Sequence, residues 1–420
     1  MECVMMVYEK ALRDLIALKD EDNPQNTEQI NRYKSLLLQH QQIYNTKEAV
    51  GIASAPGRVE IIGNHTDHNH GLVLAAAVNM DTVAAFSRRD DMLVNLASEG
   101  YEPISVDLTK LTPVVEEAGT SKALIRGVAA GLVARGYKIG GFDAAMSSQV
   151  LSGSGLSSSA AFEVLVCYLF DLLYNGGSID AVTRAQISQY AENAYFMKPS
   201  GLMDQMASSF GGMVQIDFEQ EQPKVDILQF SFAKAGYQMV IVNTRSSHDD
   251  LTPAYSAIPY EMKAAAKAAG GELLRDIPFE RFLTVLPTVQ KEAGDRAVLR
   301  ALHFYQENAL VKDAAQALKN NRIAAFFDAI NASGLSSWTQ LQNISVHEDE
   351  QPIALGLAVA KQVLGARGAC RVHGGGFAGT TLNFVPNDLL DMFTKTMESL
   401  FGEGCCHLLD VREKGPDLIL

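Results

Sequence analysis

Residues 1 to about 48 place apolar side chains near helical spacing, with a polar break at residues 20–25, and predict a helical lead-in whose second helix covers residues 30–42. Beyond this lead-in the pattern changes to short β-like runs separated by Gly, Asn and Asp, at residues 51–55, 72–78, 82–87 and 93–97. A helix over residues 121–135 and a strand over residues 142–150 follow. This alternation predicts an α+β domain.

The second half of the chain has the same mixed character. Strands are predicted at residues 213–218, 238–243 and 380–385, and helices at residues 256–269, 295–308, 311–331, 353–364 and 388–401. The chain shows no internal repeat. We place a domain boundary near residues 205–215, which predicts an N-terminal domain of residues 1–210 and a C-terminal domain of residues 211–420.

Charge and cysteine content restrict the class of protein. The 420 residues include 35 Lys and Arg against 49 Asp and Glu, a net charge of −14, so a general nucleic-acid binder with a basic face is excluded. The five cysteines are an odd number without CxxC spacing, which favours a reducing compartment. Neither a secretion signal nor a bilayer-spanning segment is expected, and these features predict a cytoplasmic protein whose partners are small molecules.

A glycine- and serine-rich segment, LSGSGLSSSAA at residues 151–161, follows a predicted strand and opens an apolar helix. Glycines allow a close backbone approach to an anion, and the amides of a helix start add positive potential, so the segment can form a phosphate cradle. A Rossmann fingerprint is excluded because Ser158 stands at its third glycine, and the Walker A and GxSxG patterns are absent. A plain turn that caps a buried helix fits this segment equally well.

A dense polar stretch, APGRVEIIGNHTDHNHG, covers residues 55–71. His65, His68 and His70 beside Asp67 are possible metal ligands, but the spacing lacks the HExxH pattern of a helical zinc site. Recognition of sugar hydroxyls is favoured over metal binding, because these side chains offer donors and acceptors at short reach. A hydrated turn is the simple alternative.

Two further segments stand out. Asp204 lies between Met203 and Met206 in PSGLMDQMASSFGG, where a solvated surface charge is not expected, although it could cap a helix. The run RVHGGGFAGT at residues 371–380 contains three consecutive glycines, which indicates a backbone that closely approaches another part of the protein.

In this order, the four segments resemble the motifs of the galactokinases, within the GHMP family of small-molecule kinases. The resemblance covers roughly residues 51–386. It implies a two-domain α+β GHMP kinase fold with the active site in the cleft between the domains. The activity that it implies is ATP-dependent phosphorylation of the anomeric hydroxyl of D-galactose, with Mg²⁺ as the metal.

The resemblance also assigns roles to residues. Asp204 and Arg58 are the catalytic pair, and it stays open whether Asp204 removes the proton of the sugar hydroxyl or stabilises an alkoxide. Mg²⁺ is assigned to the Ser159 hydroxyl and the Glu192 carboxylate. ATP is assigned to the phosphate loop, namely Gly153, Ser154, Gly155, Leu156, Ser157, Ser158 and Ser159.

The sugar contacts implied by the resemblance are Asn64, His65, Asp67, the backbone of Gly201, and Tyr255. Asn64 replaces the family's glutamate, which accepts from the sugar 6-hydroxyl, and His68 replaces its tyrosine. A neutral side chain at position 64 tolerates a 6-carboxylate or a missing 6-hydroxyl better than glutamate does. Galactose is therefore the first choice, and galacturonate and L-arabinose stay open.

Two other classes of protein remain as alternatives. A non-catalytic sugar and ATP sensor on the same fold is disfavoured, because the serine-alanine run of the phosphate loop is complete and both Asp204 and Arg58 are present. A metal-dependent hydrolase would require a transition metal bound by the histidine turn.

Overall fold

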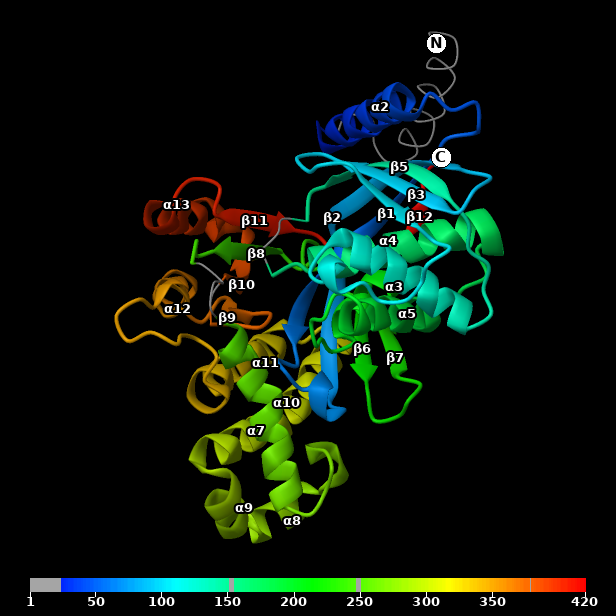
Figure 1. Cartoon of the computed structure of the whole chain (residues 1–420). Coiled ribbons are helices and arrows are strands. Elements are labelled where there is room, and N and C mark those ends of the chain that lie inside the picture. Colours follow the sequence, from blue (N-terminus) through cyan, green and yellow to red (C-terminus); the bar gives the residue numbers. More distant parts are fainter. Residues whose placement is uncertain (1–23, 151–154, 247–250, 378) are drawn as a thin grey trace.

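The computed structural model describes residues 24–150, 155–246, 251–377 and 379–420 of the chain (Figure 1). The helical lead-in predicted at residues 1–48 lies partly outside the described residues. Its described part contains helix α2, Pro24–Tyr44, which confirms the helix expected at residues 30–42. Gly153 and Ser154 of the predicted phosphate loop also lie outside the described residues.

The larger sheet has eight strands in the order β12-β1-β2-β5-β3-β4, with β6 paired to β2 and β7 paired to β6. Its strands are β1 Gly51–Ile62, β2 Leu72–Arg88, β3 Leu93–Ser98, β4 Ile104–Asp107, β5 Phe142–Ser148, β6 Met213–Asp217, β7 Lys224–Leu228 and β12 Asp417–Leu418. The prediction of two strands at residues 72–78 and 82–87 was wrong, because both belong to β2. The polar residues between them form no turn: Asn79 donates to the Asp410 carbonyl, and Asp81 pairs with Pro56.

Helices cover both faces of this sheet. On one face lie α3 Ser121–Ala134, α4 Ser158–Phe170 and α5 Ala181–Ala194, while α2 lies on the other (Figure 1). Helix α6, Met203–Phe210, packs against α4 and α5. Side chains alternate accordingly, because successive residues of a strand point to opposite faces. Ala53 and Ala84 pack in the core beneath α3, α4 and α5, whereas Ile52 and Val83 pack against α2.

The smaller sheet has four antiparallel strands in the order β11-β8-β10-β9. They are β8 Tyr237–Asn243, β9 Ala369–His373, β10 Thr380–Pro386 and β11 Cys406–Leu409. One face packs on α12 Pro352–Leu364 and α13 Leu390–Phe401, through residues such as Val240 and Val242. The other face, with Ile241 and Leu382, shares a core with the ends of β1 and β2.

A group of helices completes the fold, and α7, α8 and α9 lie lowest in Figure 1. The helices of this group are α7 Thr252–Ala268, α8 Phe279–Thr284, α9 Leu286–Ala293, α10 Asp295–Lys319 and α11 Ile323–Ser336. Two helices were predicted at residues 295–308 and 311–331, and the position of the break between them was wrong. The chain turns instead after Lys319, where Asn321 takes a positive φ of 53°, a conformation that asparagine tolerates better than most residues.

The division into residues 1–210 and 211–420 stays a prediction. Strand pairing crosses it, because β6 and β7 follow residue 210 and join the larger sheet, and β12 returns to pair with β1. Among the described helices, none combines the length and the apolar character that a membrane crossing requires.

Candidate active site

Arg58 and Asp204 form a two-point ion pair between the larger sheet and its helical layer. Arg58 lies in β1, and Asp204 lies in the first turn of α6. Nε of Arg58 donates to Oδ1 and Nη2 donates to Oδ2, both at 2.7 Å. The Arg58 side chain is 7% exposed and that of Asp204 is 24% exposed, so the carboxylate still reaches solvent. The two catalytic residues expected from the sequence are therefore adjacent.

Asp204 is held in its ionised form. Burial by itself raises the pKa of Asp204, but the charge and hydrogen bonds of Arg58, with a hydrogen bond from Ser157, outweigh burial and lower the pKa below its ordinary value. Ser157 donates from Oγ to Asp204 Oδ2 at 2.7 Å. The carboxylate is thus a fixed negative charge that accepts at least three hydrogen bonds.

The described part of the phosphate loop lies directly against this pair. The Arg58 guanidinium donates to the Gly155 carbonyl, and the Arg58 amide donates to the Leu156 carbonyl at 3.0 Å. Ser157 has a φ of 60°, and α4 begins at the next residue, Ser158. The loop therefore ends at a helix start, the arrangement that favours an anion.

The loop also contacts the smaller sheet. A Cβ added to Gly155, whose φ is 72°, would lie 2.7 Å from Thr380 Oγ1 and 2.8 Å from His373 Nδ1. Gly155 is thus required both by its backbone conformation and by the close packing of β9 and β10.

Glu192, near the end of α5, is buried and accepts hydrogen bonds on both carboxylate oxygens. Oε1 accepts from Ser159 Oγ at 2.8 Å and from Lys198 Nζ at 2.9 Å. Oε2 accepts from Ser200 Oγ at 2.7 Å and from Gln205 Nε2 at 2.8 Å. The 2.8 Å between Ser159 Oγ and Glu192 Oε1 suits two neighbouring ligands of Mg²⁺, because adjacent oxygens of an octahedral site lie about 3 Å apart. These two residues fit the metal, although the described residues contain no cluster of three or more His, Cys, Asp or Glu side chains suited to a metal.

The predicted sugar residues surround the glycine turn that follows β9. His65 Nε2 donates to the Gly375 carbonyl at 3.1 Å, and Tyr255 donates from its hydroxyl to the Gly376 carbonyl at 2.8 Å. Burial, with the nearby charge of His68, lowers the pKa of His65 to about 3, so the ring is neutral. The close approach expected from three consecutive glycines is therefore found, because a Cβ on Gly375 would lie 2.6 Å from the Tyr255 ring.

Asp67 and Gly201 are in direct contact, although they lie on different loops. A Cβ added to Gly201 would lie 1.7 Å from Asp67 Oδ2. Gly201 lies two residues before α6, the helix that contains Asp204. Four of the five predicted sugar residues therefore lie on segments next to the Arg58–Asp204 pair.

The side chain of Asn64, predicted as a sugar contact, binds other parts of the protein. Its side chain is fully buried, and its Nδ2 donates to both Glu60 oxygens and to the Gly374 carbonyl, the last at 2.7 Å. Its Oδ1 accepts from Asn343 Nδ2 at 2.8 Å. Both ends of the amide are occupied by the protein itself, because Glu60 and Asn64 belong to a buried polar network at the sugar loop, residues 63–71 between β1 and β2.

Sequence reasoning missed most of this network. Glu307 of α10 accepts from the backbone amides of Gly63 and Asn64, at 3.0 and 3.1 Å, and Arg371 of β9 donates to Glu60 Oε1 at 2.8 Å. Glu60 and Arg371 both stood within the segments singled out from the sequence. A charged residue inside an otherwise apolar strand was the available signal.

The histidine turn does not gather ligands around one point. His65 donates to a backbone carbonyl, and its ring is 6.0 Å from that of His68, centroid to centroid. His68 Nε2 lies 3.9 Å from Asp67 Oδ1. This arrangement gives no support to the metal-dependent hydrolase.

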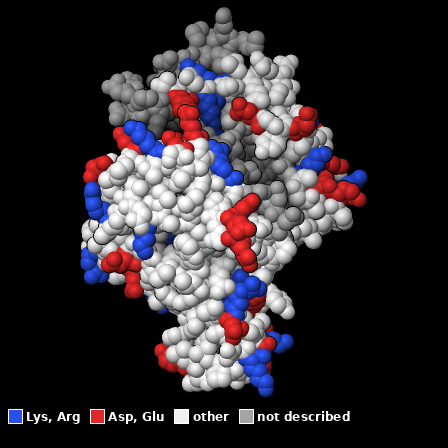
Figure 2. Space-filling view, turned by 90° about the vertical axis from the view of Figure 1, so that its left-hand side faces the viewer, with Lys and Arg blue, Asp and Glu red and all other residues white. Residues whose placement is uncertain are grey.

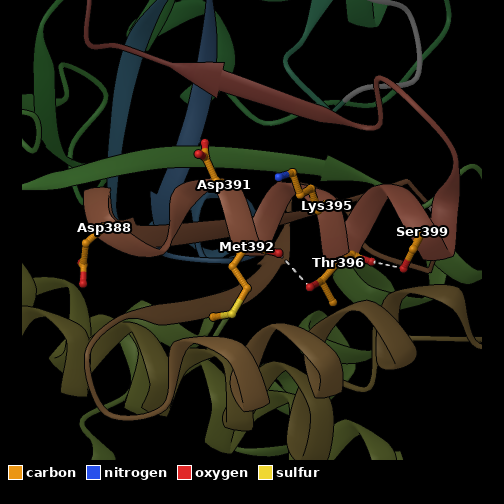
Figure 3. A pocket seen from close by; sticks show the side chains of 6 residues that line it. All are labelled: Asp388, Asp391, Met392, Lys395, Thr396 and Ser399. Carbon is orange, nitrogen blue, oxygen red and sulfur yellow. Dashed lines mark hydrogen bonds between the residues drawn. The ribbon is translucent and has the colours of Figure 1, made fainter.

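A surface hollow among the described residues lies apart from the four motifs. Basic and acidic side chains are interspersed on the face shown in Figure 2. The hollow, of about 590 Å³, lies along α13 (Figure 3) and is lined by Asp388, Asp391, Met392, Lys395, Thr396 and Ser399. Two of its hydroxyls, on Thr396 and Ser399, donate to carbonyls of their own helix. The hollow shares no residue with the four motifs.

Known proteins resemble this chain over most of its length. Two family models match, the galactokinase galactose-binding signature over residues 38–88 and the GHMP kinases N terminal domain over residues 123–212. The chain is 32% identical over 359 residues to a galactokinase of Streptomyces coelicolor, across 84% of this chain and 89% of that protein. The chain belongs to the galactokinase family. A galactokinase of Glaesserella parasuis serovar 5 is similarly related, with 33% identity over 346 residues, 81% of this chain and 86% of that protein.

Solved structures confirm the GHMP kinase fold. A galactokinase from Lactococcus lactis matches with a TM-score of 0.81 at 24% identity, covering 92% of this chain and 99% of that one. The mevalonate kinase of Methanococcus jannaschii matches with a TM-score of 0.62 at 13% identity, over 87% and 99% of the two chains. The α+β class predicted from the sequence is therefore confirmed for this member of the galactokinase family.

Proposed function

We propose that this protein is an ATP-dependent sugar-1-kinase that phosphorylates the anomeric hydroxyl of D-galactose and produces galactose 1-phosphate and ADP. Membership of the galactokinase family supports the chemistry, and the galactose in the Lactococcus lactis structure supports the sugar. The observation that carries the proposal is the contact of Asp204 with both Arg58 and Ser157, because it holds an ionised carboxylate at the start of α4, the phosphate helix that follows the phosphate loop.

Asp204 accepts a hydrogen bond from the anomeric hydroxyl in this proposal, and Arg58 keeps the carboxylate ionised and oriented. Because its pKa is lowered, Asp204 is a weak base towards a free hydroxyl. Proton transfer therefore comes late, when the bond between the sugar oxygen and phosphorus has begun to form and the hydroxyl has become more acidic. Positioning and charge stabilisation then supply most of the rate, as expected for phosphoryl transfer.

The phosphate loop holds the ATP phosphates in this proposal, through the helix start at Ser158 and the residues that precede it. Of the assigned residues, Gly155, Leu156, Ser157, Ser158 and Ser159 are described, and Gly153 and Ser154 lie outside the described residues. Ser159 and Glu192 would hold Mg²⁺, which neutralises charge on the transferred phosphoryl group when it is bound.

His65, Asp67, Gly201 and Tyr255 form the sugar site in this proposal. Asp67 accepts from sugar hydroxyls, and the phenol of Tyr255 and the ring of His65 lie on the glycine turn beside it. Asn64 could contact a sugar only by giving up its bonds to Asn343 and Glu60. We therefore assign it to the support of the sugar loop, and the argument from Asn64 for galacturonate or L-arabinose loses its structural basis.

We also propose that the partners are ATP and the sugar, without nucleic acid or membrane, and that the enzyme acts in the cytoplasm. The four cysteines in the described part of the chain, Cys167, Cys370, Cys405 and Cys406, carry free thiols, which supports a reducing compartment.

A coupled assay of ADP release over a panel of sugars tests the proposal. With ATP and Mg²⁺ present, turnover is expected with D-galactose and far less with D-galacturonate or L-arabinose, and ³¹P NMR of the product is expected to show a phosphate ester at C1. Faster turnover with either alternative sugar would correct the substrate. Absence of turnover with every aldose, or phosphorylation at another carbon, would refute a sugar-1-kinase.

A further inference from the structure

Lys198 carries the one positive charge that touches Glu192 in the described structure. It lies on the turn between α5 and α6, where its amide donates to the Glu192 carbonyl at 3.1 Å and its Nζ donates to Glu192 Oε1 at 2.9 Å. The Lys198 side chain is 56% exposed, whereas that of Glu192 is 2% exposed. A solvent-accessible ammonium group therefore pairs with a buried carboxylate.

Lys198 and Ser159 bind the same oxygen of Glu192, Oε1. Ser159 Oγ and Lys198 Nζ both donate to Oε1, while Ser200 and Gln205 occupy Oε2. If Ser159 and Glu192 hold a divalent cation, this cation needs the same oxygen. An ammonium group and a divalent cation on one oxygen repel each other strongly where solvent screening is weak.

Lys198 is also the partner of Glu192 best able to move away. The other three are neutral, and Gln205 is fully buried in α6, where Nε2 also donates to Glu163 Oε2 at 3.2 Å. Lys198 is the charged partner, and its side chain is more than half exposed. A long, exposed and charged side chain can leave without disturbing the core.

The phosphate groups of a nucleotide offer the displaced ammonium a new partner. The phosphate helix begins at Ser158, one residue before the serine that shares Oε1 with Lys198. Gln205, the residue next to Asp204 in α6, donates to the other oxygen of Glu192, so the ammonium lies near the segment that carries Asp204. Hydrogen bonds between an ammonium group and phosphate oxygens are among the stronger ones in proteins.

We propose that Lys198 is the resident counter-ion of Glu192 in the free protein and that its ammonium group moves to the phosphate oxygens when metal and nucleotide bind. This inference rests on the proposed function. Lys198 thus keeps the buried carboxylate neutralised before binding and contributes one positive charge to the nucleotide afterwards. For an acidic protein, such a local and movable charge offsets the repulsion of ATP.

Two binding measurements on Lys198→Ala test this exchange, because they should change in opposite directions. Mn²⁺ alone, followed by electron paramagnetic resonance on the nucleotide-free protein, is expected to bind about fivefold more tightly, since the competing ammonium is gone. ADP with saturating Mg²⁺, followed by calorimetry, is expected to bind about tenfold more weakly, since a charge-assisted hydrogen bond is lost. Lys198→Arg is expected to restore nucleotide affinity.

Lys319→Ala is the matched control, because Lys319 is 42% exposed and also pairs with a carboxylate, Asp226, at 3.6 Å. It should leave both affinities unchanged. If both affinities of Lys198→Ala fall, or only one of them changes, or neither does, the exchange is overturned. The proposed function is tested separately, by sugar turnover of the wild-type protein. The binding measurements do not depend on turnover, so the two failures can be distinguished.

Discussion

Arg58 and Asp204 are 146 residues apart in the sequence, yet their side chains meet through two hydrogen bonds of 2.7 Å. The contact joins the long first strand to the helix that carries the aspartate, and Ser157 adds the start of the phosphate helix to it. Three of the four motifs seen in the sequence therefore converge where the carboxylate is ionised and still partly open to solvent.

Asp204→Asn removes the negative charge and retains the shape of the side chain. We expect kcat to fall by about 10²–10⁴, the range for the loss of a positioned acid–base group, with a much smaller change in sugar affinity. Steady-state kinetics and sugar binding by calorimetry measure the two effects. Asp217→Asn is the control, because Asp217 also pairs with an arginine, Arg275 at 3.0 Å, and is similarly exposed at 27%. Equal losses in both variants would contradict a catalytic role.

Gly201→Ala tests the role of Asp67 without changing Asp67 itself. The new Cβ would lie 1.7 Å from Asp67 Oδ2, so the carboxylate must rotate away. We expect the KM for galactose to rise about 10-fold or more, as for the loss of a hydrogen bond to a charged group, while the KM for ATP stays within about twofold. Gly356→Ala is the control, because its Cβ meets nothing closer than an ordinary contact of 3.4 Å with Phe401. An unchanged KM for the sugar would exclude Asp67 from the sugar site.

Arg371→Met leaves Glu60 buried without its charged partner. Arg371 is fully buried, Glu60 is 3% exposed, and breaking such a pair costs about 3–5 kcal/mol of the free energy of unfolding. Urea denaturation measures this loss. The control is Arg367→Ala, which removes a shorter ion pair, 2.6 Å to Asp388, from a position where both side chains are more than half exposed. We expect no measurable change there, and a similarly small effect of Arg371→Met would show that the buried network does not support the fold.

Stability should fall as the pH drops below about 6.5. Burial lowers the pKa values of His303 and His373, so these rings stay neutral in the folded state, whereas the unfolded chain takes up protons. The unfolded state then binds more protons, and each such histidine lowers the free energy of unfolding by up to about 1.4 kcal/mol per pH unit until its folded-state pKa is reached. Denaturation at pH 7.5, 6.5 and 5.5 measures this slope. His303→Asn should reduce the slope, and an unchanged slope in this variant would contradict the assignment.

Most elements were predictable from local patterns, because apolar periodicity reports which face of a helix or strand is buried. Helices α3 and α12 and strands β5 and β10 lie within two residues of their predicted bounds. The errors had local causes. Asn79 and Asp81 suggested a turn, but Asn79 donates to the Asp410 carbonyl and Asp81 pairs with Pro56, and a local sequence pattern does not report such distant contacts.

For the proposed site, the resemblance of the motifs indicated Arg58, Asp204 and the phosphate loop, because residue identity and short-range spacing are read directly from the sequence. The position of Asn64 could not be predicted in the same way. Whether an amide faces a ligand or the interior depends on Glu60, Asn343 and Gly374, two of which are about 280 to 310 residues away in the sequence.

The sequence by itself determined the family, the order of the four motifs and the residue types of the proposed catalytic pair, because these depend on residue identity and short-range spacing. Only the tertiary structure decided which donors surround Glu192, that Lys198 caps one of its oxygens, and that Asn64 points into a buried network. Those features depend on contacts between residues that are distant in the sequence. The burial and the electrostatic surroundings of a side chain are set by all the segments that pack around it, and no single segment determines them.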